Sequence, residues 1–89
     1  MRTILLTLLL ASSPANAAPT VQLYHCGYRV IGIGDSVGKL YEACGPAQRV
    51  VRLQTREGGA AGTRYEYDRN GGTVMFTVSG GRVQRIERI

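Results

Sequence analysis

The 89-residue sequence has few of the residues on which catalytic and metal sites usually depend. It contains no Trp, one Phe, one His, one Lys and only two Cys. The single imidazole, His25, has no partner for a metal site, and Ser36 lacks the G-x-S-x-G setting of a nucleophilic serine. The six carboxylates include no pair whose spacing predicts a shared acid–base site. We therefore expect a non-enzymatic protein with no metal and no cofactor.

Long hydrophobic runs are also scarce, and the only strong one lies near the N-terminus. Ile4–Ala11 follows the positive Arg2 and precedes Ala15-Asn16-Ala17, which is the order of parts in a cleaved signal peptide. This eight-residue run falls far short of the roughly 20 residues that span a bilayer. A lipid anchor at Cys26 is the competing outcome, but the residues before it are too bulky for a lipobox. We expect residues 1–17 to be removed and the mature chain to be a soluble periplasmic or secreted protein.

Removal of the signal peptide leaves residues 18–89, and 89 − 17 = 72 residues suffice for one small domain. This mature chain has ten basic and six acidic side chains, a net charge of +4, and Lys39 is its only Lys. Outside the cytoplasm such a charge favours an acidic protein or an anionic envelope surface over nucleic acid. The alternative is an arginine-rich surface that serves only to keep the protein soluble.

The two cysteines, Cys26 and Cys44, are most simply interpreted as one disulfide in an oxidising compartment. Because 18 positions separate them, the loop-closure relation gives such a bridge about 3 kcal/mol of stability. His25 stands beside Cys26, so a thiol-active protein is the alternative.

A glycine-rich stretch, VIGIGDSVGKLYEACG, resembles a dinucleotide-binding turn that leads into a helix. Gly32, Gly34 and Gly38 are spaced G-x-G-x-x-x-G, so the third glycine is misplaced for that motif. We interpret the stretch as a turn before a short helix, capped by Asp35 and Ser36 and ended by Gly45-Pro46. The apolar face of this helix repeats at i, i+3, i+4 and i+7, which gives Val37, Leu40, Tyr41 and Cys44.

From residue 47 onward the apolar period changes from 3.6 to 2, which predicts strands. Turn signals at Asn70-Gly71 and Gly80-Gly81 predict tight hairpins. The final strand is expected over Arg82–Arg88, where Val83 and Ile86 are three apart, so either one lies in the turn or the strand has a bulge. Val21–Ile33 is interrupted by glycines and is interpreted as an edge segment. The predicted fold is α+β, with a short amphipathic helix packed on an antiparallel meander of about four strands.

Two groups of residues are candidates for a partner surface. Tyr65 and Tyr67 share a sheet face, where they contact either a partner or the core. Strand alternation places Arg49 with Val51 and Leu53 and turns other arginines away from that face. We predict a basic face that meets an anionic envelope component and consists of Arg52, Arg56 and Arg64 with Arg82, Arg85 and Arg88 of the last strand.

The motifs Cys26-Gly27, Gly34-Asp35-Ser36 and Cys44-Gly45-Pro46, followed by Tyr65-Glu66-Tyr67 and Gly81-Arg82-Val83, resemble a family of small secreted bacterial proteins of unknown function. That family has the pattern CG…GDS…CG-x-P, and here the proline comes one position earlier. More distantly, the chain is similar to the SmpA/OmlA (BamE-like) family. The resemblance implies a BamE-like or β-lactamase-inhibitor-like α+β layer, and without a lipobox it implies no anchored assembly role.

Together these features predict a non-enzymatic domain that acts through protein or envelope-surface contacts. An inhibitor of a secreted enzyme is an alternative, suggested by the resemblance in fold, and a thiol-active protein is another.

Overall fold

The structure is a computed structural model that describes residues 19–69 and 71–89. The predicted signal peptide lies outside the described residues. Within them the chain forms one helix and seven strands. In chain order the elements are β1 (Thr20–Val21), β2 (Leu23–Cys26), β3 (Arg29–Gly32), α1 (Val37–Cys44), β4 (Arg49–Gln54), β5 (Ala60–Arg69), β6 (Gly72–Ser79) and β7 (Arg82–Arg88).

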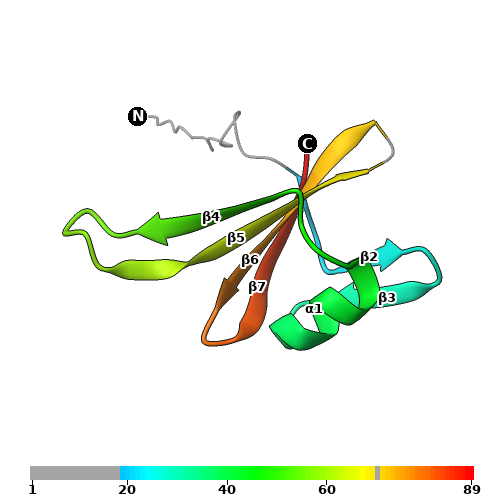
Figure 1. Ribbon diagram of the computed structural model, residues 1–89, viewed down its shortest axis with the longest axis horizontal. Coiled ribbons are helices and arrows are strands. Elements are labelled where there is room, and N and C mark those ends of the chain that lie inside the picture. The colour runs from blue at the N-terminus through cyan, green and yellow to red at the C-terminus, as the bar shows by residue number, and fades with distance from the viewer. Residues whose placement is uncertain (1–18, 70) are drawn as a thin grey trace, which may run out of the picture.

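The strands form two antiparallel sheets. Five strands pair in the order β1-β7-β6-β5-β4, whereas β2 and β3 form a separate two-stranded hairpin (Figure 1). Gly80 and Gly81 both have positive φ, 64° and 78°, in the tight turn between β6 and β7. The bulge that the spacing of Val83 and Ile86 allowed is present, because Val78 pairs with Val83 while Thr77 pairs with Arg85. In the other predicted turn, Asn70-Gly71, Asn70 lies outside the described residues and Gly71 has a positive φ of 77°.

The predicted fold class, a helix on a meander of about four strands, was wrong. The described residues are mainly strand: β1 adds a fifth strand to the larger sheet, and β2 and β3 form a second sheet. The segment interpreted as one glycine-broken edge strand is three strands, because Gly27, at φ 68°, turns the chain between β2 and β3. No local pattern signalled the pairing of β1 with β7, which is distant in the chain.

The register divides the larger sheet into two faces. One cross-strand row holds Val50, Tyr65, Phe76, Ile86 and Val21, one residue from each strand. We call the face that carries this row the inner face. The adjacent row, which lies on the outer face, holds Arg49, Glu66, Met75, Glu87 and Thr20. Because the side chains of a strand alternate, each residue of β4 or β5 is assigned to a face by this register.

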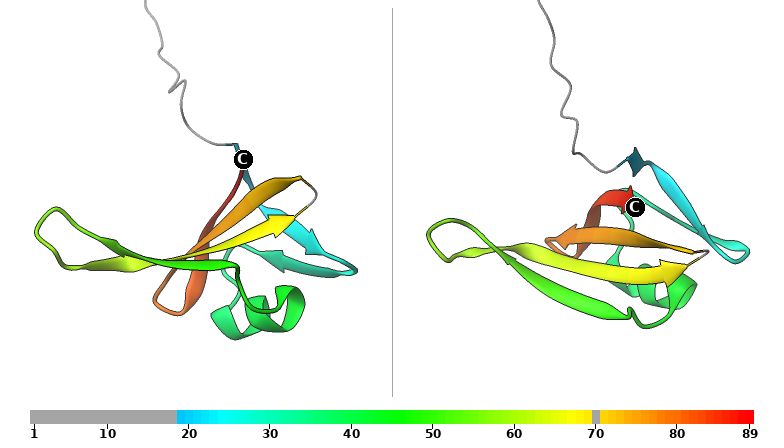
Figure 2. Two further views of the ribbon diagram at one scale, coloured as in Figure 1. Left: turned by 45° about the horizontal axis from the view of Figure 1, so that its top comes forward. Right: turned by 90° about the horizontal axis from the view of Figure 1, so that it is seen from above.

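The core lies between the inner face and a cover made of α1 and the β2–β3 hairpin. Ile31 of β3 and Leu40 of α1 are fully buried, as are Phe76 and Ile86 of the sheet. The ring of Phe76 lies between two tyrosine rings, with edge-on centroid distances of 5.9 Å to Tyr24 and 5.5 Å to Tyr67. The cover is confined to one end of the sheet, and the β4–β5 hairpin extends beyond it (Figures 1 and 2).

Candidate protein-binding surface

The disulfide predicted between Cys26 and Cys44 is confirmed. It links β2 to the last residue of α1, and the two cysteines are only 6% and 5% exposed. Both half-cystines belong to the core cluster, and the described residues include no free cysteine. The bridge therefore holds together the two elements that cover the sheet.

The glycine-rich stretch leads into a capped helix whose first amides have partners inside the fold. The side chain of Ser36 accepts from the Lys39 amide at 3.1 Å, and the Val37 amide donates to the carbonyl of Gly81 at 3.0 Å. Asp35 accepts from the Gly32 amide at 2.7 Å, and this hydrogen bond is the main cause of its lowered pKa. These contacts join the start of α1 to the turn between β6 and β7.

The other end of α1 is held by two residues of β5. The hydroxyl of Tyr67 donates to the carbonyl of Gly45 at 2.7 Å, and the guanidinium of Arg69 donates to the carbonyl of Cys44 at 2.7 Å. These bonds satisfy carbonyls that a helix end leaves without partners. Tyr67 has no exposed surface, and its burial raises its pKa to about 12. Of the two roles that the sequence left open for Tyr67, the structure therefore has it in the core, where it offers no surface to a partner.

The structure does not bring the predicted basic face together. Arg52 pairs with Thr63 and so lies on the inner face, whereas Arg64 pairs with Val51 on the outer face. Arg56 follows the end of β4 in the loop to β5. Among the last-strand arginines, Arg85 lies opposite Thr77 in the Arg64 row, whereas Arg88 lies opposite Val74 on the inner face. The sequence predicted that Val51 and Leu53 lie on the core face of β4, and this was wrong, because Val50 rather than Val51 continues the core row.

On the outer face a network of ion pairs uses much of the acidic charge. Arg49 contacts Glu66 at 2.6 Å and Asp68 at 2.7 Å, and Arg64 contacts the other oxygen of Glu66 at 2.8 Å. Thr73 donates a further hydrogen bond to Asp68 at 3.1 Å. The bond from Arg49, followed by that from Arg64, lowers the pKa of Glu66. Within the described residues, ion pairs involve four of the six carboxylates. Besides Glu66 and Asp68, these are Asp35, which pairs with Lys39, and Glu87, which pairs with Arg85.

The inner face presents a different surface where the cover ends. Val50 closes the apolar row but is 54% exposed, whereas Phe76 and Ile86 of the same row have no exposed surface. Tyr41 of α1 is 45% exposed and meets Tyr65 edge-on, with ring centroids 5.8 Å apart. Arg52 lies two residues along β4 from Val50 on the same face. We call the four residues Tyr41, Val50, Arg52 and Tyr65 the open inner surface.

Several features make the open inner surface suitable for a partner. Tyr65 is partly buried, and this burial, followed by the neighbouring Tyr41, raises its pKa above the ordinary value of 10.0. Arg52 forms no ion pair within the described residues. A hollow of about 380 Å³ adjoins Tyr65 and is lined by the start of α1, the β6–β7 turn and the first half of β5. Aromatic residues and Arg together are typical of the centres of protein interfaces. Sequence alone indicated Tyr65 and Arg52 but neither Val50 nor Tyr41.

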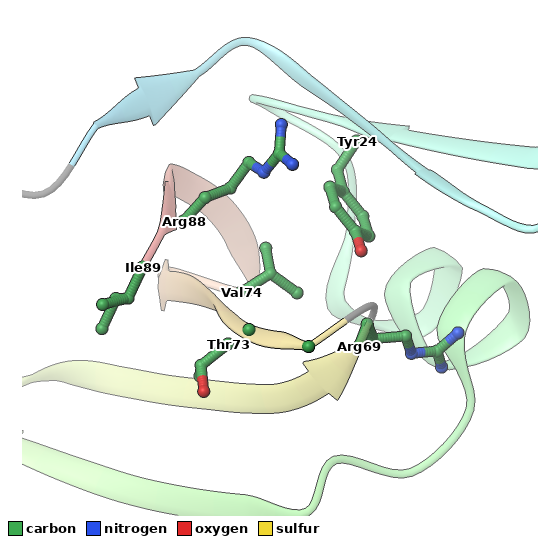
Figure 3. Close-up of a pocket in the computed structure, with 8 residues that line it drawn as sticks. Tyr24, Arg69, Thr73, Val74, Arg88 and Ile89 are labelled. Carbon is green, nitrogen blue, oxygen red and sulfur yellow. The ribbon is translucent and has the colours of Figure 1, made fainter.

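A second concave region holds two arginines but does not form an anion site. Arg69 and Arg88 line a cavity of about 180 Å³ with Tyr24 and Val74. Figure 3 shows the two guanidinium groups on different sides of Tyr24, not turned toward one another. Arg69 is already used, since it donates to Cys44 and lies 5.6 Å from the Tyr67 ring centroid. The two cations therefore do not converge on a common ligand.

No family model, curated protein or solved structure matches this chain. In the part of the chain that the structure describes, no helix is long and apolar enough to cross a membrane. The same residues contain no group of three or more His, Cys, Asp or Glu side chains placed to hold a metal ion.

Proposed function

We propose that this chain is a non-enzymatic binding domain of an oxidising extracytoplasmic compartment, and that it contacts an acidic partner protein through the open inner surface. The observation that carries the proposal is the row that ends in Val50, 54% exposed, beside Tyr65 and Arg52. An apolar row that runs from the core to solvent is the kind of surface that a partner covers.

The distribution of charge supports an acidic partner. Within the described residues, six arginines are in no ion pair: Arg29, Arg52, Arg56, Arg69, Arg82 and Arg88. Two of these, Arg69 and Arg82, donate to backbone carbonyls instead. Arg52 remains without an ion pair beside the rings of Tyr41 and Tyr65. The two acidic residues outside the ion pairs are Glu42, on α1, and Glu57, in the β4–β5 loop. An inhibitor of a secreted enzyme is one form that such a binding protein takes. The burial of both half-cystines disfavours the thiol-active alternative.

Affinity capture from an envelope extract tests this proposal, with the oxidised protein as bait. We expect an acidic protein to be retained in a 1:1 ratio at low salt and released as salt rises, because exposed charges are screened within about 10 Å at 0.1 M. Arg52→Glu should lower retention at least tenfold. Arg29→Glu makes the same charge change in β3 and should leave retention unchanged. Equal loss in both variants would mean that net charge, not the open inner surface, governs binding.

A further inference from the structure

We propose that the partner supplies an extended acidic segment, which adds to the free edge of β4 as a sixth strand of the larger sheet. This inference rests on the proposed function and specifies how the partner binds. It concerns the backbone of β4 as well as the side chains around it.

The position of β4 in the sheet is the first argument. β4 is the last strand of the five-stranded sheet, and one side of its six-residue backbone has no neighbouring strand within the described residues. The opposite edge, β1, has only two residues. Figure 2 shows β4 at one edge of the sheet, with α1 beside its start and the β2–β3 hairpin on the opposite side. An exposed edge of this length is a template for pairing with another extended chain.

The side chains of β4 are the second argument. Sheet edges avoid pairing through proline, bulges or charged side chains. The register of β4 shifts only at its end, between Leu53 and Gln54, and its inner-face charge, Arg52, selects an acidic neighbour. The strand reads RVVRLQ and contains no proline. It is apolar on both faces: Val50 lies on the inner face, and Val51 and Leu53 lie on the outer face. Arg49 does not block the edge, because Glu66 and Asp68 of β5 hold its guanidinium.

Charge decides which chain fits. Residues 49–56 contain three arginines and no acid. A second copy paired at this edge would bring one arginine-rich strand against another, and like charges on paired strands are destabilising. A segment in which acidic residues alternate with apolar ones has the complementary pattern. Its acids lie beside Arg52 on the inner face, while its apolar residues lie beside Val51 and Leu53 on the outer face.

A blocked octapeptide of alternating glutamate and valine, (Glu-Val)₄, is the probe for this inference. We expect it to bind the oxidised protein at low salt, and the (Lys-Val)₄ peptide to bind at least tenfold more weakly. Arg52→Glu should weaken binding of (Glu-Val)₄ at least tenfold, and Arg29→Glu should not. Circular dichroism of both variants shows whether the fold is kept.

Two N-methylated probes separate strand addition from contact between side chains. One peptide is methylated at its four valine nitrogens and the other at its four glutamate nitrogens. Alternate amides of a strand face opposite edges, so strand addition predicts that one methylated peptide loses binding and the other keeps it. Equal binding of both, or no binding of the unmodified peptide at low salt, would overturn the inference.

These outcomes are distinct from failure of the proposed function. If the envelope extract yields an acidic protein that depends on Arg52 while both methylated peptides bind equally, the open inner surface binds side chains and strand addition is wrong. If the extract yields no such protein, the proposed function fails regardless of the peptides. A dimer in analytical ultracentrifugation that Val50→Asp abolishes would show that a second copy occupies β4, which would also overturn the inference.

Discussion

Removal of the disulfide tests how the cover is held on the sheet. In the wild type, the disulfide closes a loop between residues 18 positions apart and so restricts the unfolded chain. The double variant Cys26→Ala/Cys44→Ala removes this restriction. The loop-closure expression then predicts a loss of about 3 kcal/mol at 25 °C. For a chain of this size the whole free energy of unfolding is on the order of 4–11 kcal/mol, so this loss is a large share. The two buried sulfurs add a cavity contribution to it.

Urea unfolding followed by circular dichroism measures this loss. With an m-value of about 1 kcal/mol/M for a small domain, the midpoint should fall by about 3 M. The wild type with a reductant should behave like the double variant, apart from the contribution of the lost sulfurs. A loss below about 1 kcal/mol would refute the reasoning, because the cover would then be held by packing of Ile31 and Leu40 alone.

Three further predictions concern single residues. Tyr67→Phe removes the hydrogen bond to Gly45 and should lower the free energy of unfolding by about 1 kcal/mol at pH 8. Because the pKa of Tyr67 is about 12 in the folded protein and 10.0 ordinarily, titration of this hydroxyl should lower the stability of the wild type, but not of the variant, by about 1.4 kcal/mol between pH 8 and pH 11. The two stability curves should therefore converge, and parallel curves would count against a buried neutral hydroxyl. The folded pKa of Glu66 is lowered, so its ion pairs stabilise the fold above pH 4.5, and this stability is lost as pH falls through the folded pKa. Glu66→Gln should therefore make stability depend less on pH in the acid range, and an unchanged dependence would contradict the ion pairs of Glu66 with Arg49 and Arg64. Gly62→Ala should lower the free energy of unfolding by about 1–3 kcal/mol, because φ is 116° and a Cβ would lie 2.6 Å from the Val78 carbonyl oxygen. The control Gly59→Ala, at an ordinary φ, should change stability by less than about 0.5 kcal/mol. Equal losses in the two variants would mean that Gly62 is not strained.

Local chemistry made several features predictable from the sequence. Only two cysteines are present, so an oxidising compartment leaves one pairing, and Cys26 and Cys44 form it. Ser36 caps α1 because a short acceptor side chain before an amphipathic run bonds the free amides of the first turn. Arg82–Arg88 is a strand with its bulge because two buried residues three apart cannot share a face without one.

The misassigned parity of β4 has a physical cause. Alternation predicts a buried face only where one face is covered, and β4 lies at an edge beyond α1, where both of its faces are partly open. Val51 and Leu53 therefore looked like core residues although they lie on the outer face with Arg64. The pairing of β1 with β7 was equally hidden, since it joins residues more than 60 positions apart and depends on no local pattern.

The central claim is that a partner meets the inner face of the β4 end of the sheet, and site-specific photo-cross-linking tests it most directly. A benzophenone amino acid is placed in turn at Val50 and Tyr41 of the open inner surface, and at Met75 and Thr20 of the outer face, which lie away from the β4 edge. In intact cells we predict one adduct with an acidic protein from positions 50 and 41, and none from 75 or 20. Adducts that form from the outer face alone, or equally from both faces, would contradict the account.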